Sequence, residues 1–132
     1  MIFVDTSFWV AAGMAADTHH AAATTLFRAH AHEPLVTSNH VRGETWTFLR
    51  RRSGHPSAVD FLDRLDRSPR VEVATVEPAL EAEALRWLRR HDEREYSFVD
   101  ATSIVLAVEL GIRRFLAFDE DFTAAGFVQL QP

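Results

Sequence analysis

The sequence of 132 residues contains no cysteine and no lysine. Without cysteine, disulfide scaffolds, thiolate metal sites and cysteine nucleophiles are excluded. Because all 14 basic residues are arginines, any mechanism that requires a lysine is excluded as well. No segment approaches the roughly 20 apolar residues of a membrane-spanning helix. The N-terminal run reaches Asp5 without the basic segment of a secretory signal, so we expect a cytoplasmic protein.

The size of the chain fits one compact domain over residues 1–132. A net charge of −5 argues against binding nucleic acid through bulk electrostatics, although bound metal would offset some of the 19 acidic residues. Two local clusters of arginine remain, one at 50–52 and the other at Arg86, Arg89, Arg90 and Arg94. The simpler interpretation of both clusters is a solvated helix face.

Apolar runs alternate with amphipathic segments along the chain. The runs predict short strands at 2–4, 35–37, 71–76, 115–118 and 127–130. The intervening segments predict N-caps at Asn39 and Ser97, a turn or short helix at 121–125, and helices at about 8–12, 17–31, 39–52, 57–66, 78–91 and 98–110. This alternation predicts an α/β fold, a three-layer αβα domain with a mostly parallel sheet of four to five short strands.

Four acidic residues occupy positions that this fold would bring together. Asp5 and Asp119 each follow an apolar strand, and Glu44 and Asp100 lie near the starts of two helices. Ligands of open parallel sheets bind at the carboxyl ends of the strands. Carboxylates that converge without a cation repel one another, so the economical explanation of the set is a divalent metal site. Oxygen ligands of this kind favour Mg²⁺ or Mn²⁺.

The aspartates also have structural interpretations. Asp5 can cap the turn that follows it, where the hydroxyls of Thr6 and Ser7 can orient the carboxylate or contact a phosphate. The segment 97–100, Ser-Phe-Val-Asp, matches a helix capping box, which is compatible with a carboxylate that points at the strand ends. Asp121 is a secondary ligand or a turn former, and the turn is the preferred interpretation.

Glu44 is the more informative acid because of its helix position. It follows Val41 by three residues and precedes Phe48 by four, so it is expected on the inward, apolar stripe. A buried glutamate needs a partner or a cation. The alternative to metal binding is a salt bridge to an arginine, either near Arg42 or at Arg114.

The segments that carry these acids resemble those of the PIN-domain nucleases, and most of all the VapC-type toxins of bacterial toxin–antitoxin pairs. The resemblance covers essentially the whole chain in length, order of elements and spacing. It rests on Asp5-Thr-Ser, Glu44 in an early helix, Ser97-Phe-Val-Asp100 and Asp119-Glu-Asp-Phe122. One departure is Phe118, because the residue before the fourth acid of the family is often Thr or Ser.

This resemblance implies that Asp5, Glu44, Asp100 and Asp119 form the metal-binding and catalytic quartet, with Ser7 as a supporting hydroxyl. It implies a Mg²⁺- or Mn²⁺-dependent endoribonuclease that acts on single-stranded or loop RNA, often tRNA or rRNA. Direct attack of water would leave a 5′-phosphate and a 3′-hydroxyl. The resemblance also implies a homodimer and a small DNA-binding antitoxin as the partner.

Two other classes of protein with acids at strand ends do not fit. A phospho-aspartyl phosphatase needs a second acid where this chain has Ser7, and a receiver-type signalling domain needs a lysine. A housekeeping PIN nuclease of RNA processing and a non-catalytic PIN-like module that binds RNA or a partner stay open as alternatives. For RNA contact we predict Arg50, Arg51 and Arg52, about 10 Å along the helix from Glu44.

Overall fold

The structure, a computed structural model, describes residues 1–132 and contains one five-stranded sheet. All strand pairs are parallel, and the spatial order is β3-β2-β1-β4-β5. The strands are short: β1 (Ile2–Val4), β2 (Leu35–Ser38), β3 (Val71–Ala74), β4 (Arg114–Leu116) and β5 (Val128–Gln129). The predicted α/β fold with a sheet of four to five short strands is therefore confirmed, and the sheet is entirely parallel.

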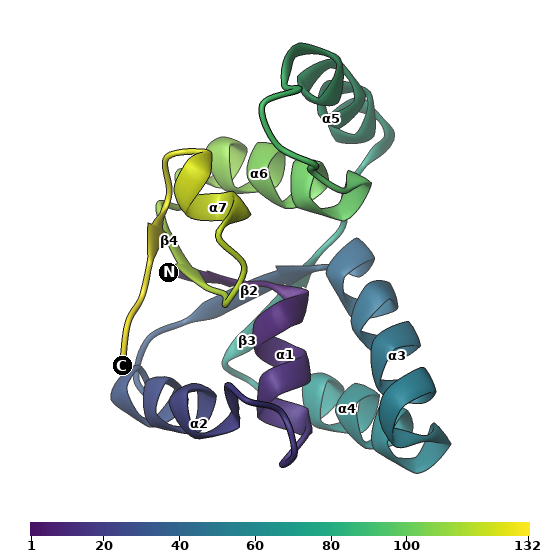
Figure 1. The fold of residues 1–132 in the computed structure, drawn as a ribbon, viewed down its shortest axis with the longest axis vertical. Helices are drawn as coiled ribbons and strands as arrows, with labels where there is room; N and C mark the ends of the chain where they lie inside the picture. Colours follow the sequence, from purple (N-terminus) through teal and green to yellow (C-terminus); the bar gives the residue numbers. More distant parts are fainter.

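Helices cover both faces of this sheet (Figure 1). In the view of Figure 1, α5 (Pro78–Arg90), α6 (Phe98–Leu110) and α7 (Asp121–Ala124) lie above the strands. Below them lie α1 (Thr6–Gly13), α2 (His20–Ala29) and α4 (His55–Arg67), and α3 (Asn39–Ser53) packs against α1 and α4. No helix has the length and apolar character needed to cross a membrane.

The core is built around the two central strands, whose side chains are covered on both sides. All three residues of β1 are fully buried, as are Phe115 and Leu116 of β4. Phe115 lies 5.0 Å from Phe3 and 4.6 Å from Phe122, measured between ring centroids. Burial on both faces explains why these strands read as continuous apolar runs rather than as alternating patterns. The packing also holds the carboxyl ends of β1 and β4 in one place.

The chain adds strands to one side of β1 and then, starting with β4, to the other side, while all the strands stay parallel. From β1 the chain runs through β2 to β3 on one side, and then crosses over the sheet to β4 and β5 on the other. Connections leave the carboxyl ends of β1 and β4 in opposite directions, which opens a crevice between them; this is where ligands of parallel sheets bind. Asp5 directly follows β1, and Asp119 follows β4 by three residues.

The helices α1 and α4 each begin two residues before the predicted position, and at the starts of α2 and α3 a side chain makes a different contact from the predicted one. Ser38, not Asn39, caps α3 by accepting a hydrogen bond from the Val41 backbone N–H (3.0 Å), while the Asn39 side chain accepts from the Val76 N–H (2.8 Å). The α2 helix begins at His20 instead of near residue 17, because the Asp17 carboxylate accepts the His19 N–H (2.8 Å) and forms a turn.

Candidate active site

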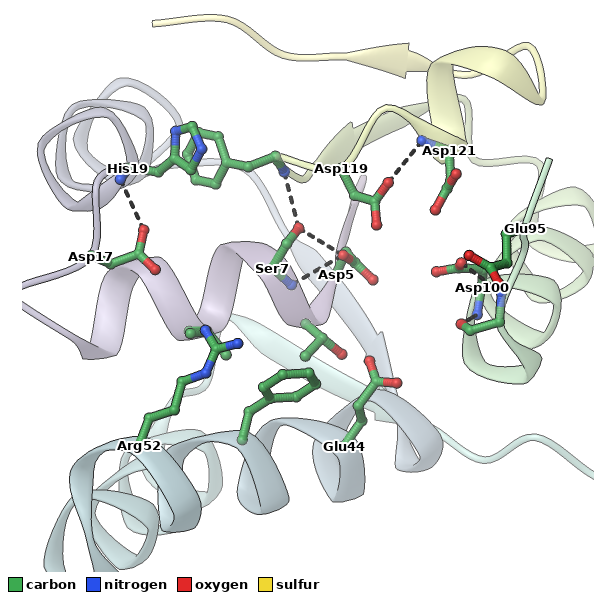
Figure 2. A pocket seen from close by; sticks show the side chains of 15 residues that line it. Asp5, Ser7, Asp17, His19, Glu44, Arg52, Glu95, Asp100, Asp119 and Asp121 are labelled. Atoms are coloured by element: carbon green, nitrogen blue, oxygen red, sulfur yellow. Dashed lines mark hydrogen bonds between the residues drawn. The ribbon is translucent and has the colours of Figure 1, made fainter.

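An open pocket of about 540 Å³ lies at the carboxyl ends of β1 and β4 (Figure 2). Its walls come from the segment after β1, from α3, from the start of α6 and from the segment after β4. The pocket contains every acid and hydroxyl residue predicted for the site: Asp5, Thr6, Ser7, Glu44, Asp100, Asp119 and Asp121. Long-range packing thus brings together residues that are spread over most of the chain.

Asp5 sits at the centre of the pocket and is held by Ser7. Both the Ser7 backbone N–H (3.0 Å) and the Ser7 hydroxyl (2.7 Å) donate to Asp5 Oδ2, so Asp5 is also the N-cap of α1. The Ser7 hydroxyl in turn accepts the backbone N–H of Phe118 (3.0 Å), which ties the end of β1 to the segment after β4. The capping and site interpretations of Asp5 are compatible, because its other oxygen points into the pocket (Figure 2).

Asp100, Asp119 and Asp121 form the tightest group of carboxylates. One oxygen from each of these residues lies within 4.8 Å of the others. The predicted capping box is present, because Asp100 Oδ2 accepts the Ser97 N–H (2.9 Å) and the Ser97 hydroxyl accepts the Asp100 N–H (3.0 Å). Asp119 Oδ1 accepts the Asp121 N–H (2.9 Å). Asp121 therefore does more than form a turn, since its carboxylate belongs to the cluster.

Glu44 faces the pocket but is only partly buried, which corrects the expected helix orientation. The inward stripe of α3 consists of Val41, Thr45 and Leu49, which repeat every four residues and are fully buried. Phe48, expected on that stripe, is 38% exposed. Glu44 makes neither an ion pair nor a hydrogen bond to any arginine. Its carboxylate points toward Asp5 (Figure 2), so the structure favours the site interpretation over the salt bridge.

The burial of the acids changes their proton affinities. Burial raises the pKa of Asp5 to about 6, against the lowering effect of its hydrogen bonds from Ser7. Burial likewise raises the pKa of Asp100 to about 7 and raises the pKa of Asp119. Burial also acts to raise the pKa of Asp121, but hydrogen bonds with Asp119 and Arg94 outweigh it and place this pKa below its usual range. Without a bound cation, simultaneous ionisation of all these carboxyl groups is therefore disfavoured.

The residues present fit a divalent cation. All candidate ligands are oxygen atoms, as Mg²⁺ and Mn²⁺ require. Asp5, Asp100 and Asp119 each use one carboxylate oxygen for a backbone contact and leave the other free toward the pocket, and both oxygens of Glu44 are free. The Thr6 hydroxyl oxygen is buried without a hydrogen-bond partner. A bound cation would favour the charged forms of these acids and so oppose the burial that raises their pKa values.

Comparison with known domain families matches residues 2–128 to the PIN domain. The chain belongs to the PIN domain family. It is 54% identical to the 23S rRNA-specific endonuclease VapC20 of Mycobacterium tuberculosis, from strain CDC 1551 and from strain H37Rv. Each alignment covers 100% of this chain and 99% of the relative.

Solved structures agree with this assignment. The crystal structure of M. tuberculosis VapC20, described as a sarcin–ricin loop cleaving toxin, superposes with a TM-score of 0.94 at 51% identity, covering 100% of both chains. FitAcB from Neisseria gonorrhoeae superposes with a TM-score of 0.71 at 16% identity, covering 100% of this chain and 98% of the other, which shows the shared fold alone. The predictions of a PIN-domain α/β fold and of an endoribonuclease toxin of the VapC type are confirmed. PIN-domain nucleases use divalent metal, which the acidic pocket suits.

The pocket of this PIN domain also contains residues that the sequence did not point to. Glu95 lines it, although its charged connector carries no recognisable motif. The neighbouring Arg94 is exposed but donates to the pocket residue Asp121 (2.8 Å), whereas Arg86 and Arg90 pair with an exposed acid of their own helix, Glu83. Only contacts between distant segments could have revealed these positions.

The three arginines predicted for RNA contact do not share one environment. Arg52 lines the acidic pocket of the PIN domain. Arg51 and Arg52 line a smaller neighbouring pocket with Glu44 and Phe48. Arg50 is exposed and lines neither. Successive helix residues point in different directions, so a run of three cannot face one site.

Proposed function

We propose that this protein is a Mg²⁺- or Mn²⁺-dependent endoribonuclease toxin that cleaves 23S rRNA in the sarcin–ricin loop. The observation that carries the metal mechanism is the convergence of four acids, each with a free oxygen, in one pocket: Asp5, Glu44, Asp100 and Asp119. The substrate is proposed from the relative that is 54% identical over the full length of this chain and is described as specific for 23S rRNA.

In this proposal the protein supplies a preorganised cage of oxygen ligands. Ser7 holds Asp5 through two hydrogen bonds, and the capping box holds Asp100, so neither carboxylate has to be ordered when the cation arrives. A bound Mg²⁺ or Mn²⁺ would supply Lewis acidity toward the scissile phosphate and toward the attacking water. The expected products carry a 5′-phosphate and a 3′-hydroxyl.

The raised pKa values of Asp5 (about 6) and Asp100 (about 7) have a consequence for this function. Near neutral pH the metal-free site retains protons that a cation must displace, so metal affinity should rise with pH over this range. Cleavage measured at a subsaturating Mg²⁺ concentration should therefore increase between pH 6 and pH 8 more steeply than cleavage at saturating Mg²⁺.

The partners follow from the toxin assignment. We propose that residues 1–132 act as a single PIN domain in the cytoplasm, as a homodimer, and that a small DNA-binding antitoxin inhibits the toxin by obstructing the acidic pocket. The similarity to a named toxin favours this role over a housekeeping nuclease. The presence of every acid of the predicted quartet disfavours a non-catalytic module.

The test uses the purified chain, free of antitoxin, with intact ribosomes and with a sarcin–ricin hairpin RNA. We expect cleavage in Mg²⁺ or Mn²⁺ and none in EDTA. Asp5→Asn and Glu44→Gln should abolish cleavage without unfolding the protein, whereas Glu109→Gln, at an exposed position of α6, should leave it unchanged. Cleavage that persists in EDTA would refute the metal mechanism, and cleavage only of unrelated RNA would refute the substrate.

A further inference from the structure

One end of the pocket carries aromatic rings together with a single acid, Asp17. The ring of Phe118 stacks on that of Phe8 with a centroid distance of 5.7 Å and an interplanar angle of 13°. The exposed ring of His19 stacks on Phe118 in turn, at 4.5 Å and 5°. Phe8 is fully buried, so the three rings form a column that begins in the core and ends at solvent.

His19 forms the outer surface of this column and is held in place from two sides. Its backbone N–H donates to the Asp17 carboxylate (2.8 Å), and its ring lies against Phe118. Neither ring nitrogen makes a hydrogen bond to the protein, and His19 lines the same pocket as the acids. The column therefore presents a flat, ordered aromatic face whose outer side has no partner in the protein.

A second aromatic face in the same pocket belongs to α3. Phe48 is 38% exposed and is the one aromatic residue among the exposed large apolar side chains. No other aromatic ring packs against it, and the Arg52 guanidinium lies 4.9 Å from its ring centroid. Both residues line the pocket. A partly exposed aromatic ring with an arginine over one face, next to a site for a phosphodiester, suits a nucleic-acid base and its phosphate.

Figure 2 shows that the pocket has two different ends. Glu95, Asp100 and Asp121 lie at one end, and Asp17, His19 and Arg52 lie at the other, where Asp17 accepts the His19 N–H. The acidic end repels an RNA backbone except where a cation intervenes. The other end offers aromatic faces, on which unpaired bases stack with little regard to sequence, and an arginine for a phosphate.

We propose that His19, backed by Phe118, and Phe48 are stacking surfaces for unpaired bases next to the scissile phosphate, with Arg52 contacting the adjoining backbone. This inference rests on the proposed endoribonuclease function and adds positioning residues to it. Stacking would place the RNA so that the scissile phosphate lies over the acids, and it would favour looped substrates, whose bases are free to stack, over duplexes.

The first test separates ring stacking from acid–base chemistry at His19. Loss of one base stack corresponds to roughly a 5- to 150-fold loss of affinity. We expect His19→Ala to lower kcat/KM for the hairpin by a factor in this range, mainly through KM, and His19→Phe to recover most of the loss. His32→Ala, an exposed histidine away from the pocket, is the matched control. A His19→Phe variant as defective as His19→Ala would overturn the stacking role.

The second test asks whether Phe48 contributes through its aromatic face or only through its apolar bulk. Phe48→Leu keeps an apolar side chain but removes the aromatic face, and Phe48→Tyr keeps the face. We expect the leucine variant to lose kcat/KM and the tyrosine variant to recover it, with all melting temperatures within a few degrees of the wild type. Equal activity of the leucine and tyrosine variants would overturn the role of this ring.

The decisive experiment removes the base as well as the side chain. Hairpins with a single abasic nucleotide at successive positions around the cleavage site are tested with the wild type, His19→Ala and Phe48→Leu. For each variant we expect one abasic position at which the loss of kcat/KM caused by the substitution and the loss caused by the missing base do not add. The reason is that both changes remove the same stacking contact. Strict additivity at every position would refute the proposal. If the wild type does not cleave this hairpin, the proposed substrate is wrong, and the same cycle is read from the binding of a labelled single-stranded RNA.

Discussion

Neutralising Asp5 should stabilise the metal-free protein, and only at pH values where Asp5 is charged. The side chain is 4% exposed, and burial raises its pKa from 3.8 to about 6. The folded protein thus holds a proton that the unfolded chain releases between about pH 4 and pH 6. Stability is greatest at the low end of this window and falls as the pH rises through it. Asp5→Asn removes this dependence at little change in volume.

The magnitude follows from the difference between the two pKa values. A shift from 3.8 to about 6 corresponds to about 3 kcal/mol of stability lost by pH 8. The amide oxygen of asparagine can take the place of Asp5 Oδ2 and keep both hydrogen bonds from Ser7. We therefore expect Asp5→Asn to gain up to about 3 kcal/mol at pH 8 and almost nothing at pH 4. For a domain of this size such a gain corresponds to a rise in melting temperature of roughly 10 °C.

Thermal unfolding in EDTA, followed by circular dichroism at pH 4, 6 and 8, measures this effect. Asp66→Asn is the control, because Asp66 is an exposed acid outside the pocket and its substitution should leave the melting temperature nearly unchanged. Adding Mg²⁺ at pH 8 should stabilise the wild type more than the Asp5→Asn variant. A lower melting temperature of Asp5→Asn at pH 8 would mean that favourable contacts hold the carboxylate in its charged form, and the reasoning would fail.

Three further predictions concern regions outside the acid cluster. Arg114→Gln should lower the melting temperature at pH 7 but not near pH 2, because the hydrogen bond from Arg114 lowers the pKa of Glu33 to about 2 and the stabilisation is lost as the pH falls through that value. Cleavage should not change, since Glu33 and Arg114 lie at the amino ends of β2 and β4, away from the pocket at the carboxyl ends. Arg52→Gln should weaken RNA binding and reduce the slope of log affinity against log salt concentration by about 1, because one phosphate contact is lost. Arg50→Gln should change neither quantity, and a salt titration of RNA binding measures both. Gly111→Ala should lower the free energy of unfolding in urea by about 1–2 kcal/mol, because Gly111 follows α6 at a φ of 69°, which alanine adopts only with strain. An added Cβ would meet no other atom, so the backbone conformation alone accounts for this loss.

The sequence alone determined the class of fold and the identity of the acids. Strands buried on both faces leave unbroken apolar runs, so β1 and β4 and the acids that follow them could be recognised locally. The capping box at Ser97 and Asp100 was readable for the same reason, because it involves residues only three apart. The resemblance to PIN-domain toxins depended on such local segments and on their order.

Tertiary structure decided how these pieces are used. The orientation of Glu44 depends on which face of α3 packs against the sheet, and that face is set by Val41, Thr45 and Leu49 rather than by Phe48. The column of His19 on Phe118 joins residues 99 positions apart in the chain, and no local pattern relates them. Strand order is equally invisible locally, because it is fixed by the packing of crossover helices on the sheet. A single sequence records periodicity and caps, whereas contacts between distant segments exist only once the chain has folded.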